Sequence, residues 1–296
     1  MSKKISLVLS GGGARGIAHI GVIEELESQG FEIVSISGTS MGALVGGVYA
    51  LGKMQEFKQW LFSLDKVKTF NLVDFTIGTN GFIKGDKVLN KMKDFIPDSK
   101  IEDLEISYRA LAVDLNSKSE FVFSEGSIYE AIRASIAIPS ILKPVKVKDM
   151  LLVDWGVLNN LPINHVQRTG NDILVAVNVN ADVPVLKPKL TKKKEESILI
   201  SYQNKIKEFY AQLSNINLKS KSESMGYFEL IRNTIILMTS QITKLTLEKY
   251  NTDILINVSR NSSEAYDFFK AEELVEIGRY ATQKAIDEHN KNEYGE

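Results

Sequence analysis

Residues Ile33–Gly42 read IVSISGTSMG and contain the pattern G-x-S-x-G, with Ser40 at its centre. An apolar run typical of a strand ends at Gly38, and Ala43–Leu51 has helical character. Between a strand and a helix, this pattern places the serine on a sharp, strained turn beside the free amides of the helix N-terminus. Ser40 is therefore a candidate nucleophile, although an ordinary helix-capping serine would produce the same letters.

The segment before this stretch predicts a glycine-rich loop beside Ser40. Ile5–Leu9 is a short apolar strand, SGGGARG follows, Ile17–Gln29 has helical periodicity, and Phe31–Ser37 is a second strand. In such a βαβ unit the two strands are parallel, so the glycine loop and the serine turn share one edge of the sheet. Backbone amides of the loop can then approach a reacting atom closely, as in an oxyanion hole. The predicted oxyanion-hole residues are Gly11, Gly12, Gly13 and Arg15.

The same glycines also fit a nucleotide-binding fingerprint. Gly11, Gly13 and Gly16 satisfy G-x-G-x-x-G between a strand and a helix. That fingerprint requires an acidic residue near the end of the second strand, whereas the only nearby acid, Glu32, lies at the strand's start. The nucleotide interpretation therefore fails its own structural context.

Composition excludes several classes of function. The chain has 296 residues, of which 44% are hydrophobic and 25% charged, and its net charge of −1 provides no field to attract nucleic acid. It contains no cysteine, and His19, His165 and His289 show no metal-ligand spacing, so we expect neither a metal site nor a cofactor. No apolar run is long enough to cross a bilayer, and the first apolar run is too short for a signal peptide. A cytoplasmic protein is the expectation.

The remaining pattern predicts an α/β chain with a mainly parallel sheet. We expect one domain over residues 1–290, with an insertion or lid at about 182–225 and a polar tail at 291–296. Apolar residues at helical spacing predict helices over Ile198–Leu213 and Phe228–Leu245, and for the second of these core packing is favoured over membrane contact. The other expected elements are helices at Met54–Leu64, 85–95, Ser127–Ile136 and Glu264–Glu288, strands at Asp172–Asn180 and Asp253–Val258, and hairpins joining Ile106–Leu115 to Glu120–Ser124 and Val145–Lys148 to Leu151–Val153.

The order of GGGARG, GTSMG and a later D-x-G resembles the patatin-like phospholipase family. The resemblance covers most of residues 5–180 and implies that family's three-layer α/β/α fold. It implies that Gly11–Gly13 with Arg15 form the oxyanion hole, that Ser40 is the nucleophile and that Asp154 is the base of a Ser–Asp dyad. Ala134-Ser135 to Pro139 and Asn159-Asn160-Leu161-Pro162 also resemble family segments. Trp155 departs from the family, which has glycine beside the aspartate.

The resemblance implies a serine acyl hydrolase that acts on lipid or fatty-acyl esters, of the phospholipase A or lysophospholipase type. We expect Met41, Ile138, Ile141 and Trp155 to contact the substrate. Two alternatives remain open: a lipid-binding protein of the same fold that has lost turnover, which Trp155 favours, and a Ser–His–Asp triad esterase. Peripheral membrane contact and homo-oligomerisation are also left open.

Overall fold

The computed structural model describes residues 3–72, 85–139, 141–186 and 227–294. By its internal contacts the chain divides into one unit of residues 1–186 and 237–296 and a second unit of residues 187–236. The predicted helix Ile198–Leu213 and most of the predicted insertion at 182–225 lie outside the described residues.

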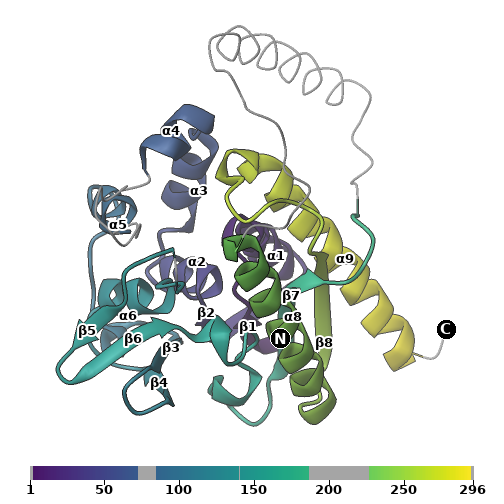
Figure 1. Ribbon diagram of the computed structural model, residues 1–296. Coiled ribbons are helices and arrows are strands. Elements are labelled where there is room, and N and C mark those ends of the chain that lie inside the picture. Colours follow the sequence, from purple (N-terminus) through teal and green to yellow (C-terminus); the bar gives the residue numbers. More distant parts are fainter. Residues whose placement is uncertain (1–2, 73–84, 140, 187–226, 295–296) are drawn as a thin grey trace, which may run out of the picture. The chain divides into compact units, whose positions relative to one another are not determined.

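A mixed, mostly parallel sheet of eight strands forms the centre of the first unit (Figure 1). Its parallel strands are β1 (Lys3–Leu9), β2 (Phe31–Thr39), β3 (Ser107–Asp114), β7 (Ile173–Ala181) and β8 (Ile254–Ser259). Its antiparallel strands are β4 (Ser119–Phe123), β5 (Val145–Val147) and β6 (Met150–Asp154). The order is β5-β6-β3-β2-β1-β7-β8, and β4 also pairs with β3. The predicted parallel pairing of the first two strands and both predicted hairpins are confirmed.

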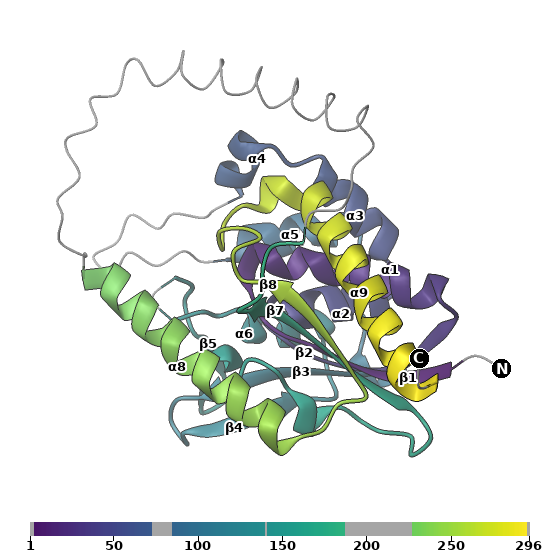
Figure 2. The same ribbon diagram turned by 90° about the vertical axis from the view of Figure 1, so that its right-hand side faces the viewer.

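Helices cover both faces of this sheet, which makes the fold a three-layer α/β/α arrangement (Figures 1 and 2). The helices are α1 (Ala18–Ser28), α2 (Met41–Ala50), α3 (Met54–Phe62), α4 (Lys66–Asn71), α5 (Asp86–Lys93), α6 (Ile128–Ser135), α8 (Tyr227–Lys249) and α9 (Ala271–Tyr294). Short 3-10 helices lie at Gly13–Ile17, Ile101–Asp103, Trp155–Val157, Ile163–His165 and Phe268–Lys270. Helix α9 continues to Tyr294, so residues 291–294 of the predicted polar tail are helical.

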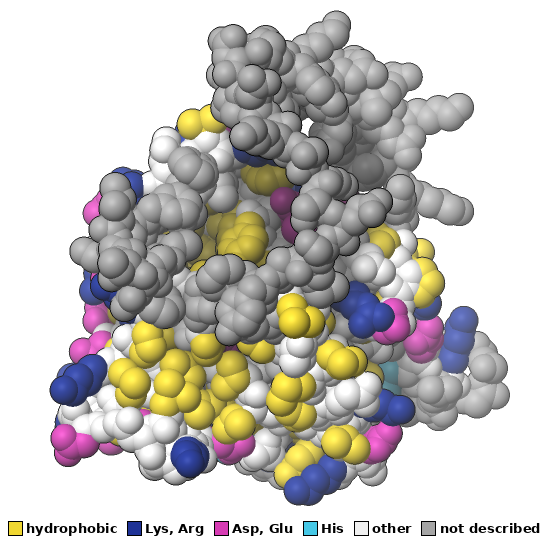
Figure 3. Space-filling view, viewed as in Figure 1, with side chains coloured by type: hydrophobic (Ala, Val, Ile, Leu, Met, Phe, Trp, Pro, Cys, Tyr) yellow, Lys and Arg dark blue, Asp and Glu magenta, His cyan; other side chains and the backbone are white. Residues whose placement is uncertain are grey.

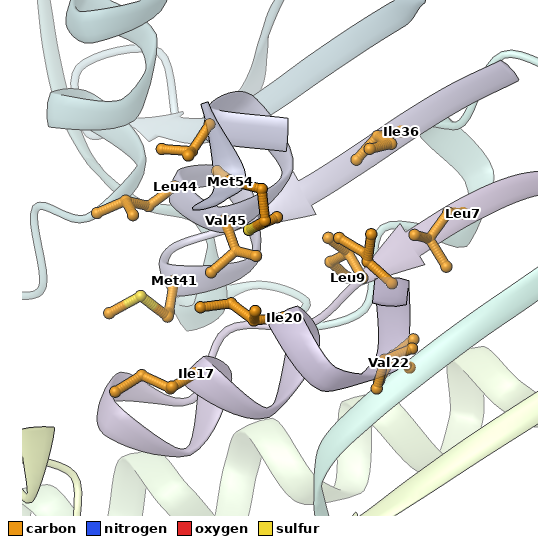
Figure 4. Close-up of a cluster of buried hydrophobic side chains, with 14 of the residues drawn as sticks. Leu7, Leu9, Ile17, Ile20, Val22, Ile36, Met41, Leu44, Val45 and Met54 are labelled. Carbon is orange, nitrogen blue, oxygen red and sulfur yellow. The ribbon is translucent and has the colours of Figure 1, made fainter. Parts of the chain in front are cut away.

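The alternation of side chains in β1 explains the two layers, since successive residues of a strand point to opposite faces. Leu7 and Leu9 lie in the larger core cluster with residues from α1 and α2 (Figure 4). Val8 points to the other face, where it packs in a cluster with Leu161 and residues of β7. Both faces of β1 are therefore buried, as expected for a central parallel strand.

The predicted core packing of the apolar stripe in helix α8 is wrong. The apolar stripe predicted to be core includes Met238 and Leu245, yet these side chains are 56% and 62% exposed. The buried side of the helix instead carries Thr243 and Thr246. Their hydroxyls donate to the carbonyl oxygens of Thr239 and Ile242, so the threonines can be buried without losing hydrogen bonds. Among the described helices, none is long and apolar enough to span a membrane.

Candidate active site

Ser40 occupies the sharp turn that its sequence pattern predicts. Strand β2 ends at Thr39 and helix α2 begins at Met41, while Ser40 has φ 53° and ψ −121°. A non-glycine residue rarely adopts such a positive φ, which costs about 1–3 kcal/mol. Small neighbours permit the turn: a Cβ atom on Gly38 would lie 2.5 Å from the amide nitrogen of Ala43, and one on Gly42 would collide with the carbonyl oxygen of Leu9.

A buried serine from α6 holds this turn in place. The amide of Ser40 donates to Oγ of Ser135 at 2.9 Å, and that hydroxyl donates to the carbonyl oxygen of Leu111 in β3 at 2.7 Å. Ser135 lies in the Ala134–Pro139 segment that sequence reasoning matched to the family without giving the residue a role. Its hydroxyl ties the candidate nucleophile to the neighbouring strand.

The carboxyl group of Asp154 lies at the end of β6, close enough to the Ser40 side chain for that hydroxyl to stabilise its charged form. Its Oδ1 atom also accepts from the amide of Gly156 at 2.8 Å. Burial raises the pKa of Asp154 to about 6, although the Ser40 hydroxyl and the hydrogen bond from the Gly156 amide act in the opposite direction. At neutral pH Asp154 is therefore mostly ionised, and its carboxylate is more basic than that of an ordinary aspartate.

The glycine loop lies against the Ser40 side chain. A Cβ atom on Gly11 would be 3.0 Å from Cβ of Ser40 and 2.6 Å from Oδ1 of Asn160. The Gly11 amide donates to the carbonyl oxygen of Asn160 at 3.3 Å, so this amide is not a free donor for a ligand. The amides of Gly12 and Gly13 donate no hydrogen bond to any described residue, and both glycines are partly exposed. They are the loop donors available to a ligand.

Arg15 does not present its guanidinium as an open anion-binding group. Nη2 and Nε donate to Oδ1 of Asn180 at 2.8 and 3.3 Å, and Nη1 donates to the carbonyl oxygen of Ser263 at 3.2 Å. Burial lowers the pKa of Arg15, and the charge of Glu264 acts to raise it. The guanidinium therefore supports the loop through Asn180, a residue that sequence reasoning gave no role. The sequence contained one sign of such a role, because Asn180 is a polar residue at the carboxyl end of a buried strand.

The four predicted substrate contacts occupy different environments. Ile138 and Ile141 are partly exposed in the segment between α6 and β5, next to Ala137, whose carbonyl oxygen accepts from the amide of Asp154 at 3.0 Å. Met41 is 9% exposed and packs within the core, near Ile17 and Ile20 (Figure 4). Figure 3, viewed as Figure 1, shows apolar side chains gathered over the β5–β6 hairpin and along α8.

The position of the Trp155 side chain contradicts its predicted contact with the substrate. Its side chain is fully buried in a small cluster with Leu111, Val113 and Val153. The indole also meets the ring of His165 edge-on, with 5.3 Å between centroids. Trp155 begins the 3-10 helix that follows β6, and its side chain lies in the same cluster as Val153, whereas Asp154 between them faces Ser40. Trp155 is a packing residue and does not narrow the site.

None of the three histidines hydrogen bonds to Ser40 or Asp154. Nε2 of His19 is 2.8 Å from the carbonyl oxygen of Ser10, and burial lowers the pKa of this histidine to about 4. Nε2 of His165 is 2.7 Å from Oε2 of Glu120. His289 lies in the last turns of α9. The triad alternative therefore lacks a histidine placed beside the serine.

Comparison with known proteins identifies the family of this chain. The family model for patatin-like phospholipases matches residues 7–166. An uncharacterized NTE family protein of Mycobacterium bovis is 31% identical, covering 97% of this chain and 92% of the relative. The proteins named Lysophospholipase NTE1 of Scheffersomyces stipitis and Kluyveromyces lactis are 25% and 28% identical over 98% and 93% of this chain, which spans 18% of each. VipD from Legionella pneumophila is a distant structural match, with a TM-score of 0.49 and 17% identity over 97% of this chain and 67% of that chain. On its sequence match and its fold, the chain belongs to the patatin-like phospholipase family.

Proposed function

We propose that this protein is a serine acyl hydrolase that cleaves lipid or fatty-acyl esters, with Ser40 as the nucleophile and Asp154 as the base. The observation that carries the proposal is the position of the Ser40 side chain beside a buried carboxyl group whose pKa it lowers, next to a loop in which two amides donate to no described residue. A nucleophile, a base and a donor pair are the parts that acyl transfer requires.

In the first step, Oγ of Ser40 attacks the ester carbonyl carbon while its proton passes to Asp154. The raised pKa of Asp154 brings the base closer to the pKa range useful for catalysis at neutral pH. The carbonyl oxygen becomes an oxyanion, which the amides of Gly12 and Gly13 stabilise. One such donor is worth about 3 kcal/mol in other hydrolases, so this pair matters nearly as much as the base.

In the second step, the tetrahedral intermediate collapses. The C–O bond to the alcohol breaks, and Asp154 returns its proton to the departing alkoxide, which leaves an acyl group on Ser40. Water then attacks the acyl carbonyl carbon and gives a proton to Asp154. When the second tetrahedral intermediate collapses, that proton returns to Oγ of Ser40, and a carboxylic acid is released.

Two observations support a lipid ester as the substrate. The partly exposed Ile138 and Ile141 lie in the segment whose Ala137 carbonyl oxygen accepts from the Asp154 amide, and they offer apolar contact to an acyl chain. The fungal relatives carry the name lysophospholipase, and the family is named for phospholipase activity. The alternative of a lipid-binding protein without turnover rested on Trp155 beside the base, and the burial of that indole removes its reason.

The test is hydrolysis of a panel of phospholipids, lysophospholipids and p-nitrophenyl esters by the purified chain. We expect Ser40→Ala to abolish turnover, and Ser63→Ala, an exposed serine after α3, to retain it. Asp154→Asn should be nearly as damaging as Ser40→Ala. A wild-type protein that cleaves none of these esters, or a Ser40→Ala variant that cleaves them normally, would refute the proposal.

A further inference from the structure

Two asparagine side chains converge on one backbone carbonyl of the glycine loop. The carbonyl oxygen of Gly11 accepts from Nδ2 of Asn180 at 2.7 Å and from Nδ2 of Asn160 at 3.0 Å. A carbonyl oxygen has two lone pairs, so this group is fully used. The two amides come from segments far apart in the chain, at the end of β7 and in the loop after β6.

The orientation of that carbonyl determines the orientation of a candidate oxyanion donor. The Gly11 carbonyl and the Gly12 amide belong to the same peptide plane, and no described peptide bond is cis. In a planar trans peptide, the C=O and N–H bonds point in opposite directions. The two asparagines therefore hold the Gly12 N–H so that it points away from them, with no acceptor among the described residues.

Arg15 determines the orientation of the Asn180 side-chain amide. Nη2 and Nε of Arg15 both donate to Oδ1 of Asn180, and a guanidinium has no acceptor for an amide NH₂ group. The Nδ2 atom of Asn180 is therefore the one that faces Gly11. The Asn180 backbone is also held, since its amide donates to Oδ1 of Asn178 at 3.0 Å.

We infer that Asn160 and Asn180 form an amide clamp that positions the Gly12 N–H for the oxyanion, with Arg15 setting the direction of Asn180. The inference rests on the proposed ester hydrolysis. It assigns no contact between either asparagine and the substrate, so both are positioning residues. Gly12 has no side chain that could fix its own peptide plane, and the peptides of a glycine loop are otherwise free to rotate.

The decisive substitution is Asn180→Asp. It keeps the size of the side chain and improves the charge pairing with Arg15, but it replaces the donor facing the Gly11 carbonyl by an acceptor. We expect kcat for p-nitrophenyl butyrate to fall about 10- to 100-fold, less than the 10²- to 10³-fold that loss of a whole oxyanion donor costs. KM should change less than about threefold, because the clamp acts on the transition state.

The control is Asn116→Asp at the tip of the β3–β4 hairpin. Nδ2 of Asn116 donates to the carbonyl oxygen of Asp149 at 2.7 Å, so the control removes the same kind of bond from an exposed turn. It should leave kcat unchanged. A second variant, Asn160→Ala, removes the other amide of the clamp and should lower kcat in the same direction without involving Arg15.

A second measurement distinguishes a positioning role of the two asparagines from a general loss of structure. A fatty-acyl trifluoromethyl ketone forms a tetrahedral adduct with an oxyanion, so its inhibition constant should rise by the same factor as kcat falls. Because ground-state binding of the acyl chain is untouched, the dissociation constant for 1-hexadecanol, which carries no anionic group for the loop amides, should not change.

The outcomes are distinguishable. Folded Asn180→Asp and Asn160→Ala variants with the kcat and trifluoromethyl ketone inhibition of the wild type would overturn the clamp and leave the proposed function intact. If Asn180→Asp does not fold, normal kcat and inhibition in Asn160→Ala overturn the clamp alone. A wild-type protein no more active than Ser40→Ala would refute the proposed function, and with it an oxyanion role for the clamp.

Discussion

Ser40 carries backbone strain where a purely structural turn residue would be glycine. Its φ of 53° is unfavourable for any residue with a Cβ atom, and its side chain is 6% exposed beside a buried carboxyl group. A serine that only capped the helix would have an extended backbone and would accept a hydrogen bond from an amide of α2, and Ser40 does neither. The proposed role of Ser40 as a nucleophile would account for this strain, whereas helix capping does not.

Replacing Ser40 by glycine should therefore stabilise the protein while removing its activity. Glycine adopts the positive φ freely, so we expect the free energy of unfolding of Ser40→Gly to rise by about 0.5–1 kcal/mol relative to Ser40→Ala. Urea denaturation of the two variants measures the difference. A Ser40→Gly variant less stable than Ser40→Ala would mean that the turn is not strained in solution.

The buried carboxyl group of Asp154 has a second consequence, for stability. Its pKa of about 6 in the folded protein lies above the ordinary value of 3.8, so the folded state holds a proton that the unfolded state has lost between these pH values. Stability contributed by the protonated carboxyl is therefore present below pH 4 and is lost as the pH rises to about 6. Above that pH, ionised Asp154 costs up to about 3 kcal/mol.

Asp154→Asn should remove this cost, because the amide carries no charge. We expect its melting temperature to exceed that of the wild type at pH 7.5, with the difference shrinking as the pH falls to 4. Differential scanning calorimetry at the two pH values makes the comparison. A difference independent of pH would show that Asp154 has an ordinary pKa.

At the scale of elements, local pattern located most helices and strands, but it did not show which side of α8 is buried. Apolar spacing indicated a core-facing stripe, and the buried side is instead built on Thr243 and Thr246 with Leu247 packed nearby. Spacing identifies a helical face, whereas tertiary contacts decide whether that face is covered. Trp155 was misplaced for a similar reason, since its position beside Asp154 in sequence puts it on the opposite face of the sheet.

A matched pair of leucines in α8 tests this orientation. Leu245 is 62% exposed, whereas Leu247 packs against the cluster that covers Val8. We expect Leu245→Ala to change the free energy of unfolding by less than about 0.5 kcal/mol, and Leu247→Ala to cost about 1–2 kcal/mol. Chemical denaturation of both variants gives the values. A larger loss of stability in Leu245→Ala than in Leu247→Ala would mean that the apolar stripe of α8 is buried in the core.

At the scale of the whole molecule, the first and last described helices pack together on one face of the sheet. A Cβ atom on Gly278 of α9 would collide with the carbonyl oxygen of Ala18 in α1, and one on Gly21 would collide with that of Val275. Sequence reasoning found both helices but not this contact, because no local pattern reports which distant backbone a glycine faces. For the same reason it pointed to a candidate nucleophile, base and glycine loop, whose motifs are local, and gave no role to Asn180.

Gly278→Ala should consequently destabilise the protein, although alanine is the better helix former by about 1 kcal/mol. The added methyl group must push two helix backbones apart, and we expect a net loss of about 1–3 kcal/mol. Gln283→Ala, at an exposed position of the same helix, is the control and should be neutral. Thermal melts of the two variants would contradict the close packing if Gly278→Ala were the more stable protein.

Direct activation of Ser40 by Asp154 is tested by the rate at which a fluorophosphonate labels the protein as a function of pH, followed by intact mass and peptide mapping. We predict a single adduct on Ser40. Its rate should fall about tenfold per pH unit below about pH 6, where Asp154 becomes protonated, and should be slow and independent of pH in Asp154→Asn. Labelling of Asp154→Asn at the wild-type rate, or an inflection that disappears in His165→Ala, would contradict the account.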